Sequence, residues 1–194
     1  DYCATLAAEL NKLSVFDNHV RAWVDMKDAK PTDKRWDWVR RGAPIVCEIG
    51  PRDAANGQVT FIQRTSLREG EKVKSTSIAR GDFIAQAPGL LAAIQKQLFE
   101  EAKQRLDANI RGDLKSWDEL ANYYGAGEDE SEIKGWARVA WSRPSGDELE
   151  RVTERLKALK LTIRNAPLKQ PTSFGPCVFT GEPGVEEILI ARAY

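Results

Sequence analysis

Histidine, cysteine and methionine are scarce in this 194-residue chain, which contains one His, three Cys and one Met. The cysteines Cys3, Cys47 and Cys177 are odd in number and far apart, which argues against a disulfide framework and for a reducing, cytoplasmic setting. The single histidine, His19, has no Ser, Cys or Asp partner at a motif spacing. The sequence therefore favours neither a disulfide-stapled protein nor a histidine-based catalyst.

The chain also lacks an excess of charge and any long apolar run. Its 29 Lys and Arg balance its 29 Asp and Glu, so a site for nucleic acid would have to be a local patch. No apolar run approaches the roughly 20 residues that a membrane span needs, so no membrane association is expected. The chain begins with Asp1 and without a signal-peptide pattern, and we interpret this start as a cut inside a longer protein.

The first half of the chain alternates predicted helices and strands. Helical spacing of leucines predicts a helix over residues 4–13, and Asp33 is a predicted cap for a short helix ending at Arg41. A strong period of three and four predicts a long helix from Leu91 to Leu106, after Pro88. Apolar or alternating segments predict strands at residues 20–24, 44–49 and 59–62. Residues 66–82 suggest a loop or an irregular edge strand.

A smaller pattern follows a Gly-rich acidic stretch at residues 125–132, which suits an exposed turn or a hinge. Its predicted elements are a strand, a helix and two strands, at residues 136–141, 147–159, 161–164 and 187–191. We therefore predict an α/β fold, with a mixed, mainly parallel sheet flanked by helices over residues 1–115 and a small α+β domain over residues 116–194.

The segment 34–41 concentrates four cations and two tryptophans within eight residues of a neutral chain. Basic side chains neutralise phosphates, and aromatic or guanidinium planes stack on unpaired bases, as in proteins that bind single-stranded RNA. An amphipathic helix with one tryptophan in the core and solvated arginines around it explains the same pattern. The spacing alone leaves both interpretations open.

Two other motifs fall short of a known site. The turn Gly50-Pro51-Arg52-Asp53 follows a predicted strand but lacks the further glycines of a dinucleotide-binding fingerprint. The segment from Cys177 to Gly181 would be a zinc knuckle if Thr180 were a cysteine. One thiol without a nearby histidine cannot supply four ligands, so bound zinc is not expected.

Several segments, in the same order along the chain, resemble the prolyl-tRNA synthetases of the archaeal and eukaryotic type, a class II family. The segments that carry the resemblance are Trp38 with Arg41-Gly42-Ala43-Pro44, Glu48-Ile49-Gly50-Pro51-Arg52-Asp53, Asn56-Gly57-Gln58-Val59, Gln63-Arg64-Thr65 and Ala191-Arg192-Ala193-Tyr194. The resemblance implies an anticodon-binding domain with its closing helix over residues 1–115. It also implies a zinc-binding-like domain over residues 116–194, and a catalytic domain before Asp1 that uses ATP and Mg.

The same resemblance implies tRNA(Pro) as the partner and a homodimeric, cytoplasmic parent enzyme. This fragment would not catalyse alone. Carried over by position, the anticodon surface falls on Lys34, Arg35, Trp38, Arg41, Arg52 and Arg64. Val39 and Val46 stand where the family usually has Glu and Arg, and valine cannot read base edges by hydrogen bonds.

The family's four zinc-ligand positions fall at Ser142, about Asp147, Cys177 and Thr180, so one thiol remains. We expect this domain to fold without metal. The terminal Tyr194 matches the family's terminal tyrosine, which implies a contact to the catalytic domain.

An alternative, favoured by Val39 and Val46, is a module that stabilises a dimer or binds another protein without reading the anticodon. A free-standing metabolic enzyme has little support, because the sequence offers no nucleophile, acid–base pair or cofactor loop.

Overall fold

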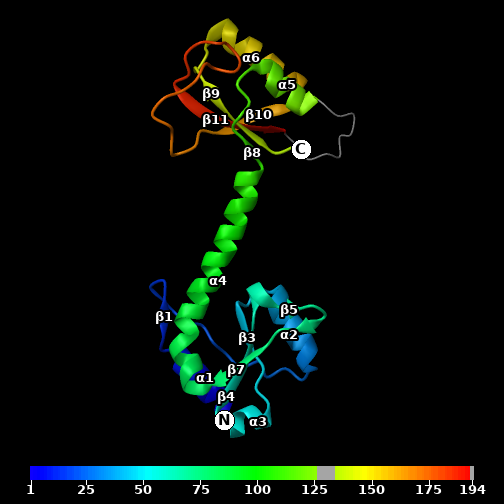
Figure 1. Cartoon of the computed structure of the whole chain (residues 1–194), viewed down its shortest axis with the longest axis vertical. Helices are drawn as coiled ribbons and strands as arrows, with labels where there is room; N and C mark the ends of the chain where they lie inside the picture. Colours follow the sequence, from blue (N-terminus) through cyan, green and yellow to red (C-terminus); the bar gives the residue numbers. More distant parts are fainter. Residues whose placement is uncertain (126–133, 193–194) are drawn as a thin grey trace. The chain divides into compact units, whose positions relative to one another are not determined.

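The computed structural model describes residues 1–125 and 134–192, and it divides into two compact units, Asp1–Ala102 and Lys103–Tyr194 (Figure 1). The boundary lies within the long helix α4 (Arg80–Ala108). Most of the expected hinge at 125–132, and Tyr194, lie outside the described residues. Within the described ranges, no helix has the length and apolar character needed to cross a membrane.

The first unit combines helices with short strands. Its helices, besides the start of α4, are α1 (Tyr2–Leu10), α2 (Pro31–Arg40), α3 (Pro51–Ala55) and the 3₁₀ turn η1 (Arg64–Ser66). Its strands are β1 (Ser14–Val15), β2 (Asn18–His19), β3 (Ile45–Cys47), β4 (Gln58–Gln63), β5 (Arg68–Glu69), β6 (Lys72–Val73) and β7 (Thr76–Ala79).

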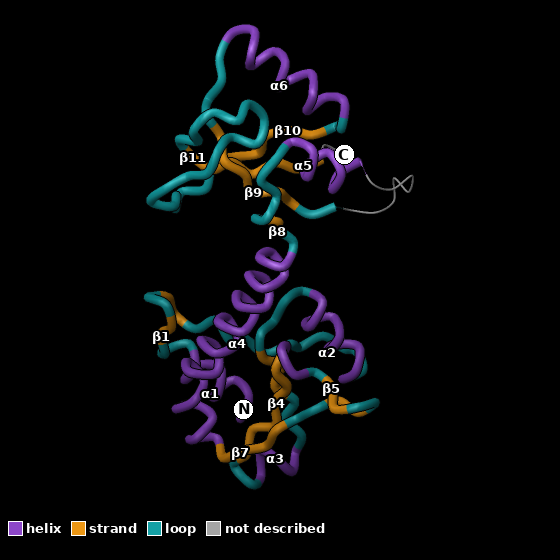
Figure 2. The backbone as a smooth tube through the Cα atoms, turned by 45° about the horizontal axis from the view of Figure 1, so that its top comes forward, coloured by secondary structure: helices purple, strands orange, loops and turns teal. Residues whose placement is uncertain are grey.

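The core of the first unit lies between its sheet and the helices α1 and α4. The sheet has the order β3-β4-β7, and two separate hairpins pair β1 with β2 and β5 with β6. The buried apolar side chains come from α1, β4 and α4, with one from the segment after β2, and are Leu6, Leu10, Val20, Val59, Phe61, Phe83 and Ala87. Figure 2 shows α1 and α4 on one side of β4 and α2 on the other.

The α/β class is confirmed, but the expectation of a mainly parallel sheet in this unit is wrong. Both ladders are antiparallel, with Val46 opposite Ile62 and Val59 opposite Ile78. Parallel neighbours need a crossover of about a dozen residues or more, usually a full helix. Only the five-residue helix α3 lies between β3 and β4, so the chain turns back antiparallel.

Two expected elements have different bounds in the structure. Residues 20–24 are extended but form no strand, because alternation creates an apolar face without supplying a hydrogen-bonding neighbour. The long helix starts at Arg80 rather than after Pro88, and Pro88 lies inside it. Burial of Phe83 and Ala87 in the core holds the turns before the proline in helical form.

The second unit is a sheet covered by two helices. Its strands are β8 (Ile110–Arg111), β9 (Trp136–Trp141), β10 (Leu161–Asn165) and β11 (Glu186–Arg192), in the order β10-β11-β9-β8. Its helices are α5 (Trp117–Gly125) and α6 (Gly146–Ala158). Only β8 and β9 pair in parallel, and the other two ladders are antiparallel.

This unit has a core of its own. The fully buried side chains at its centre include Leu120, Tyr124, Val139 and Ile190. The Tyr124 hydroxyl lies 2.9 Å and 3.1 Å from the carbonyl oxygens of Gly135 and Ile190, which ties α5 to the sheet.

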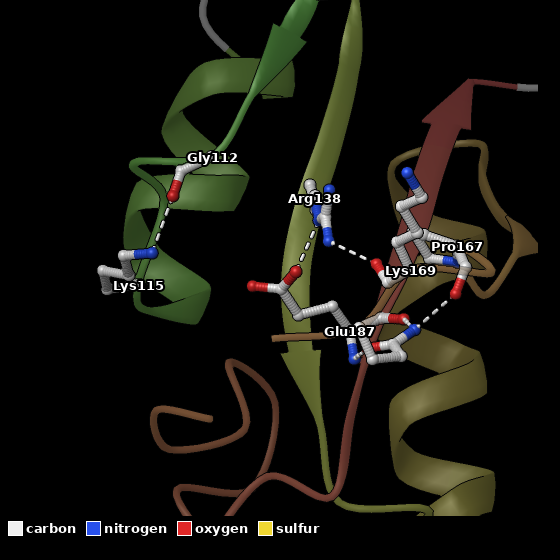
Figure 3. A network of polar contacts seen from close by, with 7 residues as sticks. Gly112, Lys115, Arg138, Pro167, Lys169 and Glu187 are labelled. Carbon is white, nitrogen blue, oxygen red and sulfur yellow. Dashed lines mark hydrogen bonds and ion pairs between the residues drawn. The ribbon is translucent and has the colours of Figure 1, made fainter. Parts of the chain in front are cut away.

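A polar network fastens the loop after β10 to the sheet (Figure 3). Arg138 on β9 forms an ion pair with Glu187 on β11 and donates to the carbonyl of Lys169 at 3.1 Å. The Gln170 side chain pairs with the backbone of Glu187 through bonds of 2.8 Å and 3.0 Å, and it donates to the carbonyl of Pro167 at 2.8 Å. These contacts hold residues 167–170 against β9 and β11.

Candidate nucleic-acid interface

The basic segment 34–41 lies on α2, and the ends of this helix follow from its sequence. Pro31 occupies the first helical turn, where its missing N–H leaves no bond unmade. Asp33 in the first turn and Arg40 in the last turn complement the helix dipole. The helix therefore starts before the predicted cap at Asp33, and two of the four cations, Arg40 and Arg41, stand at its C-terminal end.

Trp38 on α2 is tied to the extended segment that follows β2. Its indole N–H donates to Asp25 Oδ2 at 2.6 Å, and the Lys27 backbone N–H donates to Asp25 Oδ1 at 2.9 Å. The backbone bond from Lys27 and the indole bond from Trp38 lower the pKa of the Asp25 carboxyl. Lys34 adds a bond from Nζ to the Asp25 carbonyl at 3.1 Å. Trp38 and Lys34, two of the predicted site residues, thus meet at Asp25.

A group of cations gathers around Asp37 on the same helix. The Asp37 carboxylate lies 3.1 Å from Arg41, 3.6 Å from Lys27 and 3.9 Å from Arg40. Arg41 and Lys27 also lie over the Trp38 ring, at 5.1 Å and 5.7 Å from its centroid. Around Trp38 there are thus four cations, Lys27, Lys34, Arg40 and Arg41, and two carboxylates, Asp25 and Asp37, which leaves a local positive excess on a neutral chain.

Two of the predicted arginines have firm partners inside the protein. Arg35 donates from Nε and Nη2 to both oxygens of Glu48, each at 2.6 Å, and these bonds raise the pKa of Arg35. Arg64 donates from Nη1 to the Val39 carbonyl at 2.7 Å, near the C-terminal end of α2. A cation there also complements the negative end of the helix dipole. These two arginines position α2 against β3 and η1.

A groove of about 1510 Å³ in the first unit collects most of the predicted residues. Five of them line it, namely Lys34, Arg35, Trp38, Arg41 and Arg64. The sixth, Arg52, lies on α3 with an exposed side chain and does not line the groove. Val39 and Val46 are half-buried, and Val46 lines the same groove.

The sequence pattern drew no attention to Trp23, which also lines this groove. It stands edge-on to Trp38, with ring centroids 5.0 Å apart and planes at 71°. Its position in the sequence could have indicated that its ring is exposed. In the alternating segment 20–24 it falls on the outward side, where a tryptophan would have no core to fill.

Three of the four zinc-ligand positions come together in the second unit. Ser142 Oγ and Thr180 Oγ1 lie 3.1 Å apart. Burial raises the pKa of the Cys177 thiol, but hydrogen bonds with Ser142, Thr180 and nearby backbone lower it overall. In the part of the chain that the structure describes, the side chain of Asp147, in the exposed first turn of α6, makes no polar contact with these three residues.

This group does not fit a zinc ion. Two hydroxyls and one thiol do not provide the four thiolate, imidazole or carboxylate ligands of a structural zinc site. Within residues 1–125 and 134–192, no three His, Cys, Asp or Glu side chains cluster in a way that could hold a metal.

Comparison with known protein families gives this surface a context. Residues 1–84, which include α2 and all six predicted residues, match the family model described as the anticodon binding domain. These residues are therefore similar to that family.

The whole chain is similar to proline–tRNA ligases, so residues 1–84 and the second unit share these relatives. It is 50% identical over 195 residues to the enzyme from Sphingomonas elodea and 48% identical to that from Sphingopyxis alaskensis. A more distant enzyme from Bdellovibrio bacteriovorus is 34% identical. The matches cover 100% of this chain but 38%, 36% and 36% of those proteins, so the chain spans little more than a third of their length. The resemblance to prolyl-tRNA synthetases is confirmed.

Proposed function

We propose that this chain is the tRNA anticodon-binding and positioning module of a proline–tRNA ligase. The observation that carries the proposal is the positive excess around Trp38 on α2, inside the residues that match the anticodon-binding domain. Holding the anticodon stem orients the distant acceptor end, and binding energy used in this way raises the rate of a reaction elsewhere.

Within this surface we propose two kinds of role. Arg41 and Arg52, both exposed, contact RNA phosphates. Lys34 and Trp38 support the protein segment beside them, which contains Asp25. The exposed ion pair of Arg41 with Asp37 is weak enough to exchange for a phosphate. Arg35 and Arg64, which already hold Glu48 and the Val39 carbonyl, act by fixing α2 in place.

The parent protein is proposed to attach proline to tRNA(Pro) for protein biosynthesis, using ATP with Mg in a catalytic domain upstream of residue 1. This chain does not catalyse alone under the proposal. Tyr194 is proposed as a contact to that domain, and the parent as a cytoplasmic homodimer. The three free cysteines support the reducing setting.

The two parts of the chain are proposed to have separate tasks. Residues 1–115 act as the anticodon-binding domain with its closing helix, and residues 116–194 as an appended domain. We propose that the appended domain folds without zinc, with the Ser142–Thr180 hydrogen bond and the buried Cys177 in place of a metal site.

The test is a titration of the 194-residue chain with the anticodon stem-loop of tRNA(Pro) and with the same loop carrying permuted anticodon bases, at two salt concentrations. Phosphate contacts weaken steeply with salt, whereas base contacts give discrimination. Tighter binding of the proline loop at both salts supports a module that reads the anticodon. Equal binding that disappears with salt reduces the role to a backbone clamp.

A different outcome would favour the second candidate function, an interaction or dimer-stabilising module. The specific observation behind it is that Val46 in the groove wall and Val39 on α2 carry no group able to read a base edge. Absence of RNA binding, together with a dimer that Arg41→Ala and Arg52→Ala disrupt, would support this candidate and contradict the first.

A further inference from the structure

Trp23 is the one exposed tryptophan of the six in the chain. The residue is 60% accessible to solvent, whereas Trp36, Trp38, Trp117, Trp136 and Trp141 are buried or half-buried. A single exposed apolar residue is ordinary in a soluble protein. Trp23 differs because it is held in place and lies beside the cation cluster.

The backbone on both sides of Trp23 is fixed. The Asn11 side chain accepts from the Ala22 N–H at 2.7 Å and donates to the Ala22 carbonyl at 2.9 Å. Two residues after Trp23, Asp25 is bound by the Trp38 indole and by Lys34. The Trp23 ring is therefore presented from an anchored segment, which reduces the entropy lost when a ligand binds to it.

The two indoles of this site differ in what covers them. Lys27 and Arg41 lie over the Trp38 ring. Among the residues the structure describes, no cation lies over the ring of Trp23, whose one aromatic neighbour is Trp38 in an edge-on contact. Of the pair, Trp23 has the aromatic surface still open to solvent.

We propose that Trp23 is a stacking surface for one unpaired base of the anticodon loop. The inference rests on the proposed tRNA binding and names a contact that the match to relatives does not assign. Lys27 and Arg41, beside the indole pair, are placed to neutralise the phosphates that flank the stacked base.

Stacking has a consequence for selectivity. Every base has an aromatic face, so stacking on Trp23 adds affinity and discriminates little between bases. This contact does not need the side chains that Val39 and Val46 fail to provide. Trp23 thus strengthens binding of the loop, whatever discrimination the rest of the groove supplies.

The experiment compares Trp23→Phe with Trp23→Leu in the 194-residue chain. Both variants keep an apolar side chain, but only Phe keeps an aromatic face. The probe is the tRNA(Pro) anticodon stem-loop with 2-aminopurine at one anticodon position at a time, because its fluorescence is quenched on stacking. Phe99→Leu, which replaces an aromatic residue of 59% exposure on α4, is the matched control.

We expect Trp23→Leu to weaken binding by about 5- to 150-fold, and to abolish the quenching at one position. Trp23→Phe should stay within about 5-fold of the wild type. The slope of log affinity against log salt and the ratio between proline and permuted loops should not change, because neither phosphate contacts nor base-edge contacts are altered.

The outcomes separate this inference from the proposed function. If the wild type binds the loop and Trp23→Leu binds as well as Trp23→Phe, the stacking surface is refuted while tRNA binding stands. If Trp23→Leu changes the salt slope instead of the quenching, Trp23 acts through the cations and the inference is again refuted. If the wild type does not bind the loop at low salt, the proposed function fails and stacking fails with it.

Discussion

Trp38 and Asp25 are joined by a hydrogen bond of 2.6 Å from the indole N–H to the carboxylate. This bond links α2 to a segment that has no strand partner, because residues 20–24 belong to no sheet. The position of Trp23, two residues before Asp25, therefore depends on a side-chain contact and not on a β-ladder.

Asp25→Ala is expected to loosen this link. The Trp38 indole N–H would lose its acceptor, and the edge-on geometry of Trp23 and Trp38 would relax. The measurement is the exciton couplet of the two indoles in far-ultraviolet circular dichroism, which should decrease. Asp28→Ala, at an exposed neighbouring carboxylate, is the control and should leave the couplet unchanged.

The same contact predicts a pH dependence. Because the pKa of Asp25 is lowered in the folded protein, its stabilising effect is complete above the ordinary value of 3.8 and is lost as the pH falls through the lower folded value. The couplet of the wild type should therefore be constant from about pH 5 to 8. A decrease beginning near neutral pH would contradict this assignment.

Arg41→Ala and Arg52→Ala should each weaken loop binding and reduce its dependence on salt. Each lost phosphate contact lowers the slope of log affinity against log salt by about 0.7 for a single strand. Lys157→Ala, at an exposed cation of α6 in the second unit, is the control. An unchanged slope for both arginine variants would show that their charges do not face the RNA.

Arg35 and Glu48 are predicted to be coupled energetically. Their side chains are 18% and 30% exposed and share two hydrogen bonds. A double-mutant cycle with Arg35→Ala and Glu48→Ala should give a coupling of about 1–2 kcal/mol in the free energy of unfolding. The exposed pair of Arg111 and Asp113 is the comparison, and its coupling is expected to be smaller because solvent screens it. Equal coupling of the two pairs would show that Arg35 is not held firmly by Glu48, and Arg35 would then be a candidate for binding phosphate.

The sequence predicted most elements of the second unit because their patterns are complete within each segment. The predicted strand at 136–141 has the bounds of β9, and the helix over 147–159 closely matches α6 (Gly146–Ala158). Strand directions in the first unit were not predictable in this way. They depend on the length of the connection between β3 and β4, and the five-residue helix α3 is too short for the crossover that parallel strands need.

The candidate site shows the same limit. Charge and residue type pointed to α2 as part of the site, and five of the six predicted site residues line one groove. Residue type did not reveal that Arg35 faces Glu48, since this pair joins a helix to the residue after β3, thirteen positions away. Trp23 was missed for a related reason, because its role depends on which face of an extended segment remains uncovered.

The second unit is predicted to be independent of zinc. Elemental analysis should find zinc well below one equivalent, and a chelator should leave the melting temperature unchanged, because two of the three clustered side chains are hydroxyls. Stoichiometric zinc would overturn the prediction. Thr180→Val tests the replacement contact, and the loss of its hydrogen bond to Ser142 should cost about 1 kcal/mol.

Gly135 sets the approach of β9 to the residue before β8. A Cβ at this position would lie 2.2 Å from the Asn109 carbonyl oxygen, and that oxygen accepts from the Trp136 N–H at 2.7 Å. Gly135→Ala must therefore displace backbone, and should destabilise the second unit by about 1–3 kcal/mol. Gly112→Ala is the control, because a Cβ there meets no atom within 4 Å. Hydrogen exchange should show faster opening of β9 and β11 in Gly135→Ala, with β4 unchanged. Equal acceleration in β4 would mean that the two units unfold together, since Val59 and Phe61 of β4 belong to the other core.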